Sequence, residues 1–219
     1  MYFAAQRETA TRMSNLDKAL AEISAMRAQM ARASEFRGYG PLTFGVTGGL
    51  AALAAVAQRI WLPHPGSHPG LYLLLWIGVA GLCAGIIGFE MVNRSRRIHS
   101  DLAEEMIWAA VEQFTPAAVA GAAVTAILFL FAPEAVWMAP GLWQITFGLG
   151  VFASVRFLPR SLMLVGGWYL ACGLACLAVA RAAHAFTPWA MGVPFGVGQW
   201  LIATLLQRNG RVMHGEAAD

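Results

Sequence analysis

The densest group of side chains with chemical potential lies between residues 90 and 112, where acids and a histidine flank three arginines. The acids and the histidine are Glu90, His99, Asp101, Glu104, Glu105 and Glu112. Glu90 and Glu112 lie at the edges of apolar runs, and carboxylates beside an imidazole predict a cation or proton site at the mouth of a membrane bundle. The alternative is a solvated helix whose acids pair with Arg94, Arg96 and Arg97.

Two amides inside apolar runs form the second candidate. Gln144 and Gln199 each follow a turn that contains Trp and Pro, and segments 137–144 and 189–199 resemble each other with unequal offsets. Related parallel repeats would place the two amides around a central cavity, as in transporters. The alternative is that each amide hydrogen-bonds across helices and holds the bundle together.

Proline and glycine mark the third candidate. Pro194 lies inside an apolar run and removes one backbone hydrogen bond, so it predicts either a hinge or binding site or a tolerated kink. Gly192 and Gly196 beside it form a GxxxG pattern, and Gly81 and Gly85 form another. Both patterns predict close helix packing.

The sequence lacks recognisable catalytic motifs. It contains no HExxH, GxSxG or GxxxxGK[ST] pattern, its only lysine is Lys18, and all five histidines fall outside the apolar runs. Cys83, Cys172 and Cys176 do not have the spacing of a disulfide framework or a CxxC site. We therefore expect no catalytic residue, no cofactor and no resident metal, and favour a protein that is not an enzyme.

The elements that would position these candidates are membrane helices. The chain is 58% hydrophobic and 12% charged, with a mean hydropathy of +0.57, which excludes an ordinary soluble domain. Runs of about 20 apolar residues suffice to cross a bilayer. They lie at 41–62, 71–93, 115–133, 141–158, 161–180 and 188–207. The sequence thus predicts an all-α, polytopic membrane helical bundle of six transmembrane helices in three hairpins.

Basic residues indicate the orientation of this bundle. Thirteen of the 15 Lys and Arg residues fall on one side of the predicted spans, and only Arg59 and Arg181 fall on the other. Cytoplasmic connections keep positive charge, so both termini, including a tail over 208–219, are expected in the cytoplasm. Tyr72, Trp76 and other aromatics are expected at the outer interface. We predict a multi-pass protein of the cell inner (plasma) membrane.

The first 36 residues are expected to form a separate amphipathic helix. Apolar residues between 13 and 30 recur at three- and four-residue steps, with Arg27 as the one polar interruption. This stripe predicts either a short coiled coil, which would give a homo-oligomer or bind a partner protein, or a helix lying on the membrane surface.

The sequence favours the first of two functions, and the second is the alternative. The first is a small-molecule or ion permeation or binding protein that uses Glu90, Glu112, Gln144, Gln199 and Pro194. The second is a non-transporting membrane subunit or sensor whose cytoplasmic helices form a protein-binding platform. The lipid bilayer is the expected environment in both cases, and nucleic acid is not an expected partner because no compact basic domain is present. The lack of an acid near the middle of a span argues against ion-coupled transport.

Overall fold

The computed structural model describes residues 40–98, 101–155, 160–179 and 186–215. The chain divides into two units, Met1–Phe36 and Arg37–Asp219, and all described residues belong to the second. The helix predicted over 1–36, with its apolar stripe over 13–30, lies outside the described residues. The tail predicted from residue 208 is helical as far as Gly215.

The described residues form six long helices and contain no strand. The long helices are α2 (Pro41–Trp61), α3 (Pro69–Ile98), α4 (Asp101–Phe131), α5 (Ala139–Ser154), α6 (Met163–Val179) and α7 (Pro188–Gly215). Short 3-10 helices η1 (Pro65–Ser67), η2 (Pro133–Met138) and η4 (Arg160–Leu162) lie between them. Six helical stretches are long and apolar enough to cross a membrane, so the predicted all-α membrane bundle is confirmed.

The helix boundaries follow from proline and from charge. Pro41, Pro69 and Pro188 begin α2, α3 and α7, and Pro140 lies in the first turn of α5; proline fits there because the first turn needs no N–H donor. Two apolar stretches begin earlier than predicted. The third begins at Trp108 because α4 runs without a break through Pro116, and the fourth at Pro133 because η2 leads directly into α5.

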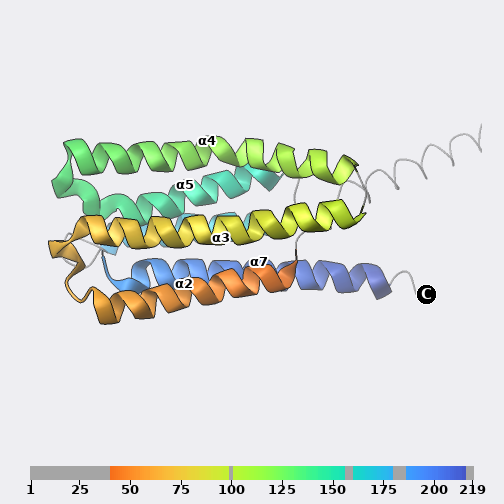
Figure 1. The fold of residues 1–219 in the computed structure, drawn as a ribbon, viewed down its shortest axis with the longest axis horizontal. Coiled ribbons are helices and arrows are strands. Elements are labelled where there is room, and N and C mark those ends of the chain that lie inside the picture. The colour runs from red at the N-terminus through yellow and green to blue at the C-terminus, as the bar shows by residue number, and fades with distance from the viewer. Residues whose placement is uncertain (1–39, 99–100, 156–159, 180–185, 216–219) are drawn as a thin grey trace, which may run out of the picture. The chain divides into compact units, whose positions relative to one another are not determined.

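The six helices run side by side, and consecutive helices point in opposite directions (Figure 1). One end of this bundle carries η1, η2 and the start of α7, and we call it the proline-rich end. The opposite end carries the start of α2, the end of α3, the start of α4 and the C-terminal part of α7, and we call it the arginine-rich end. The side chains of the candidate site are distributed between these two ends.

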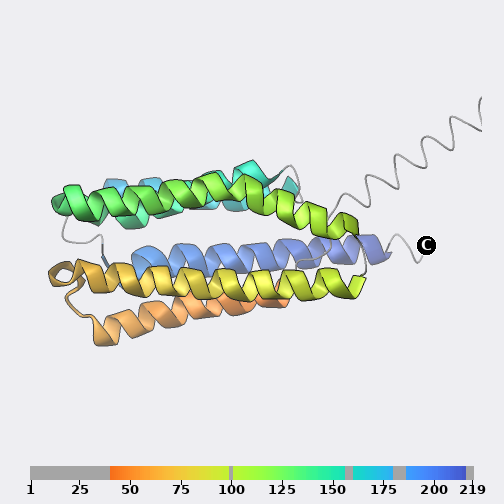
Figure 2. The same ribbon diagram turned by 45° about the horizontal axis from the view of Figure 1, so that its top comes forward.

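The helices pack in two groups of three. The first contains α2, α3 and α7, and the second contains α4, α5 and α6 (Figure 2). The closest pairs are α2 with α7 and α5 with α6, whereas α3 and α4 hardly touch each other. The predicted third hairpin, α6 with α7, is therefore divided between the two groups and joins them.

Glycines explain why these two pairs are the closest. A Cβ atom at Gly48 of α2 would lie 2.7 Å from Trp200 Cδ1 and 3.0 Å from the carbonyl oxygen of Gly196. A Cβ atom at Gly173 of α6 would lie 2.7 Å from the carbonyl oxygen of Gly141 in α5. Side chains larger than hydrogen at these positions would separate the backbones. A Cβ atom at Gly192 would clash with Ala55 Cβ of α2, so close packing of the Gly192 and Gly196 pattern is confirmed.

The other GxxxG pattern behaves differently. Cβ atoms built at Gly81 and Gly85, and at Gly78 and Gly88 on the same helix, meet no atom within 4 Å. The prediction of close packing at Gly81 and Gly85 is therefore wrong for contacts within the described chain. The reason is that α3 lies at the margin of its group. The face that α3 turns toward the other helices is formed by other residues. Only 17% of the apolar stretch of α3 and 11% of that of α4 are buried.

Candidate functional site

The acids predicted to form a mouth are not drawn into the bundle. Glu112 is exposed on α4, and Glu90 is half-buried on α3, beside a lateral hollow of about 430 Å³ that Thr43, Gly81 and Gly85 also line. No group of three or more His, Cys, Asp or Glu side chains suited to a metal ion occurs among the described residues. His99 and the side chains at 101–105 lie outside the described residues, so the predicted cation site at 94–115 stays a prediction.

Gln144 and Pro194, which the sequence presents as separate candidates, belong to one arrangement. Pro194 lies inside the continuous helix α7 and has no N–H to donate to the carbonyl of Ala190 four residues earlier. Gln144 of α5 donates to that carbonyl instead, with Nε2 2.8 Å from the Ala190 oxygen. The side chain of one helix thus replaces a backbone hydrogen bond that proline removes from another. The Pro194 carbonyl accepts a bond of 2.9 Å from Trp168 Nε1.

Gln58 holds a second set of elements together. Its Nε2 donates to the carbonyl of Phe186 at 2.7 Å, and its Oε1 accepts from Trp76 Nε1 at 2.8 Å. These bonds connect α2, α3 and the segment that precedes α7. The Gln58 amide is only 1% exposed, and because both of its ends are bonded its burial carries no unpaired polar atom.

Gln199 lies farther from the proline-rich end than Gln144. It accepts a bond of 3.3 Å from the Thr47 hydroxyl of α2, and the Cys83 thiol of α3 lies 4.0 Å from the Thr47 carbonyl. Gln199 follows the first proline of its helix by eleven residues, whereas Gln144 follows Pro140 by four. The two amides therefore occupy different depths and do not face each other as symmetric partners.

A different equivalence relates α5 and α7. Thr146 to Gly150 and Pro194 to Gly198 share the pattern Phe-Gly-x-Gly, 48 residues apart. In α5 the first glycine of the pattern faces α6 and the second faces α4; in α7 the first faces α2 and the second faces α6. Each helix is thus packed between two others through the same two positions. Under this alignment Gln144 corresponds to Gly192, not to Gln199.

Aromatic rings fill the middle of the bundle. The Phe147 ring of α5 lies 4.7 Å from Tyr169 of α6 and 5.5 Å from Phe195 of α7, and 5.3 Å from Phe114 of α4. Their edge-to-face arrangements are favourable and rigid. These rings separate the polar contacts near the proline-rich end from the Thr47 and Gln199 pair.

Three buried polar atoms have no hydrogen-bond partner among the described residues, namely Tyr72 Oη, Gln144 Oε1 and Tyr169 Oη. Tyr169 Oη approaches Gln199, but the geometry falls short of a hydrogen bond. Tyr72 and Gln144 are both 0% exposed. Unpaired buried polar atoms are costly and usually indicate a water, an ion or a ligand that completes them.

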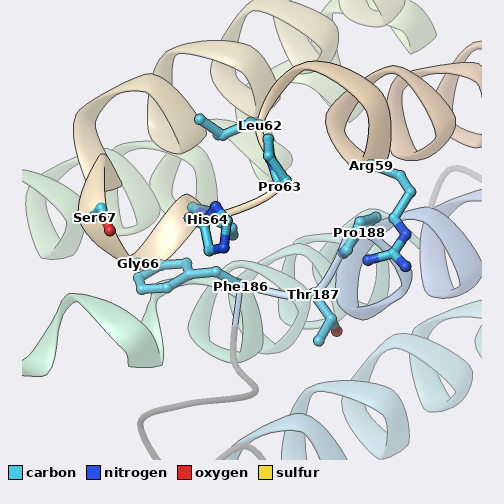
Figure 3. Close-up of a pocket in the computed structure, with 10 residues that line it drawn as sticks. Arg59, Leu62, Pro63, His64, Gly66, Ser67, Phe186, Thr187 and Pro188 are labelled. Carbon is cyan, nitrogen blue, oxygen red and sulfur yellow. The ribbon is translucent and has the colours of Figure 1, made fainter.

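A hollow at the proline-rich end (Figure 3) is connected to the unpaired Tyr72 through the residues that line it. Phe186 lines this hollow, and its ring packs edge-on against Tyr72 with 4.8 Å between the centroids. Leu62 lines it too, and packs against the cluster of buried residues that contains Tyr72 and Met191. Gln144 touches the same cluster, with Nε2 3.9 Å from Met191 Sδ. Tyr72 and Gln144, two of the three residues with unpaired buried atoms, thus belong to the same end of the bundle as the hollow.

The hollow itself is polar on one side. It has a volume of about 360 Å³ and is lined by Arg59, Leu62, Pro63, His64, Pro65, Gly66, Ser67, Phe186, Thr187 and Pro188. Figure 3 shows the Arg59 guanidinium directed toward the start of α7, with His64 and Ser67 contributed by the connection that contains η1. The arrangement can hold a small molecule by hydrogen bonds and charge.

Sequence reasoning missed the two residues that matter most at this end. The sequence predicts Tyr72 and Trp76 among aromatics at the membrane interface, but both side chains of α3 are buried among other helices, at 0% and 3% exposure. A signal was present, because Tyr72, Trp76, Val79 and Cys83 repeat at three- and four-residue steps. Such a stripe marks the buried face of a helix.

The fold and these contacts define a polytopic α-helical membrane protein with a hydrogen-bonded polar layer beneath one end. Comparison with protein-family models, curated proteins and solved structures found no match to this chain.

Proposed function

We propose that this protein binds a small polar molecule, which enters at the proline-rich end and completes the hydrogen bonding of Tyr72 and Gln144. One observation carries the proposal: Phe186 lines a polar hollow, and its ring packs against the fully buried Tyr72, whose hydroxyl has no partner among the described residues. A ligand pocket with mostly apolar walls and a few placed polar groups is the usual form of a small-molecule site.

Phe186 is the element that separates the hollow from the polar layer in this proposal. Its ring covers Tyr72, and its carbonyl is held by Gln58. A shift of the Phe186 ring would open Tyr72 to the hollow without breaking the Gln58 bonds, because those bonds involve the backbone. Binding is favoured over an open pore, since aromatic rings occupy the middle of the bundle.

The orientation that goes with this proposal puts the proline-rich end outside the cell. Among the described residues, Arg59 is the only Lys or Arg at that end, whereas Arg160 and Arg208 lie at the other. Retention of positive charge on the cytoplasmic side supports this orientation in the inner membrane, with both termini in the cytoplasm.

The test compares Tyr72→Phe with Tyr169→Phe, the matched removal of another buried hydroxyl. Each full-length protein is purified in a mild detergent and denatured, and the small molecules released are identified and quantified by mass spectrometry. We expect a polar molecule from wild type and from Tyr169→Phe, with at least a tenfold lower amount from Tyr72→Phe. Equal amounts from all three proteins, or none from wild type, would contradict the proposal.

A second candidate function, a cytoplasmic platform for a partner protein, is supported by helix length. α3 has 30 residues and α4 has 31, about ten more than a bilayer needs, and the additional residues belong to the arginine-rich end. Deletion of residues 1–36 would release a co-purifying protein if this platform operates together with the N-terminal unit. An unchanged set of co-purifying proteins would count against it.

A further inference from the structure

We infer that the hollow at the proline-rich end is a phosphate-binding site, for the headgroup of an anionic phospholipid or for free phosphate. This inference deepens the proposed function, because the same hollow is the proposed entrance. It rests on the lining residues, on the ends of two helices and on the charge balance at this end of the bundle.

The lining supplies donors and one fixed positive charge. Arg59 contributes a guanidinium, His64 an imidazole, and Ser67 and Thr187 contribute hydroxyls, and none of the ten lining residues is acidic. A guanidinium presents its N–H groups in a planar fork that matches phosphate oxygens. Four donor side chains from three segments line the hollow, and the oxygens of a phosphate can accept hydrogen bonds from all of them.

Arg59 is not committed elsewhere in the described part of the chain, where it has no ion-pair partner. It lies in the last turn of α2 and is exposed. The only described acid near this end, Glu134, does not line the hollow. A guanidinium that is directed toward the start of α7 (Figure 3) and not neutralised by a carboxylate attracts an anion.

The helix ends reinforce this charge. α7, which is 28 residues long, begins at Pro188 on the wall of the hollow, so the positive end of its dipole lies there. α2 ends at Trp61 on the same side, and the full positive charge of Arg59 exceeds the roughly half negative charge at that helix end. The combined field favours an anion between the two helices.

The test measures lipid and phosphate binding to the full-length protein. Native mass spectrometry in mixed micelles compares dioleoylphosphatidylglycerol with dioleoylphosphatidylcholine, for wild type, Arg59→Gln and the matched control Arg208→Gln at the arginine-rich end. Thr187→Val serves as a second variant with a smaller change. Binding of inorganic phosphate to the same proteins is measured by isothermal titration calorimetry.

We expect wild type and Arg208→Gln to retain the anionic lipid at least fivefold more than the zwitterionic lipid, and Arg59→Gln to lose this preference. Phosphate binding that also depends on Arg59 would assign the site to free phosphate, whereas lipid preference without phosphate binding would assign it to a headgroup. Lipid and phosphate binding unaffected by both Arg59→Gln and Thr187→Val would overturn the inference.

Failure of this inference differs from failure of the proposed function. If a molecule whose retention depends on Tyr72 persists in Arg59→Gln and contains no phosphate, the phosphate assignment fails and the binding function stands. If Arg59-dependent anion binding is found while nothing depends on Tyr72, the hollow binds phosphate and the deeper site is rejected.

Discussion

At the scale of single residues, the polar side chains within the spans act mainly by completing the backbone. The sequence identifies Gln144 and Pro194 as unusual, and both are buried at the core. It does not reveal that Gln144 donates to the carbonyl that Pro194 leaves without a donor. The two residues are 50 positions apart in the sequence and come together only because α5 packs near α7. The unpaired hydroxyl of Tyr72 could not be predicted at all, since a tyrosine at a span end is more often an interface anchor.

The first prediction concerns the bond between Gln144 and Ala190. Gln144→Leu leaves the Ala190 carbonyl without a donor, at a cost of about 1–3 kcal/mol for a buried unpaired acceptor. In a Pro194→Ala background the alanine N–H supplies that donor, so the same substitution costs at least about 1 kcal/mol less. Gln144→Leu removes the unpaired Oε1 in both backgrounds. The difference between its two costs therefore measures the hydrogen bond from Gln144 to the Ala190 carbonyl.

Unfolding of the four proteins in detergent, followed by far-ultraviolet circular dichroism during titration with dodecyl sulfate, measures these free energies. Equal losses from Gln144→Leu in the two backgrounds would show that Gln144 does not replace the bond that Pro194 removes.

The second prediction contrasts two buried aromatic donors. Trp76→Phe leaves Gln58 Oε1 unpaired, so we expect the free energy of unfolding to fall by about 1–3 kcal/mol. Tyr169→Phe removes a hydroxyl that has no partner among the described residues, so we expect no loss of stability. The same dichroism assay compares them, and a larger loss from Tyr169→Phe than from Trp76→Phe would refute this assignment.

At the scale of helices, hydropathy and proline predicted where the spans lie but not which faces touch. The first, second, fifth and sixth spans are predicted to within two residues of the observed limits, because long apolar runs end at charged or proline-rich turns. The two GxxxG patterns are equivalent in sequence, yet only Gly192 and Gly196 pack. Choosing between them requires the tertiary positions of α2 and α3, which local sequence does not contain.

The third prediction is a pair of glycine substitutions on different helices. Gly173→Ala would bring a methyl group within 2.7 Å of the Gly141 carbonyl oxygen, whereas Gly85→Ala meets open space. We expect Gly173→Ala to destabilise the protein by about 1–3 kcal/mol, as overpacking does. Gly85→Ala should leave stability unchanged or raise it by up to about 1 kcal/mol through helix propensity.

Thermal unfolding in detergent at matched protein concentration measures both variants. Destabilisation by Gly85→Ala as large as that by Gly173→Ala would mean that the open face of α3 is covered in the solubilised protein, and a concentration dependence would point to a second copy.

At the scale of the whole described bundle, two groups of three helices are joined mainly through α6 and α7. The number of spans and their alternation were predictable from length and composition. The division into groups was not, because it depends on which glycines meet across helices that are distant in sequence.

The fourth prediction tests the orientation. In a background with all three native cysteines replaced by alanine, Ser67→Cys should react with a membrane-impermeant maleimide on intact cells, because Ser67 is exposed at the proline-rich end. Arg208→Cys should react only after the membrane is permeabilised. The reverse pattern would place the proline-rich end in the cytoplasm and with it the proposed entrance.

The Phe-Gly-x-Gly segments of α5 and α7 begin seven residues after Pro140 and Pro188, and the two helices run in the same direction. Tandem duplication of a unit that crosses the bilayer twice would produce such a correspondence. Such a unit returns to the side from which it started, so a second copy lengthens the chain without inverting any later span. A bundle that grew in this way would keep the basic residues that set its orientation on the same side of the membrane.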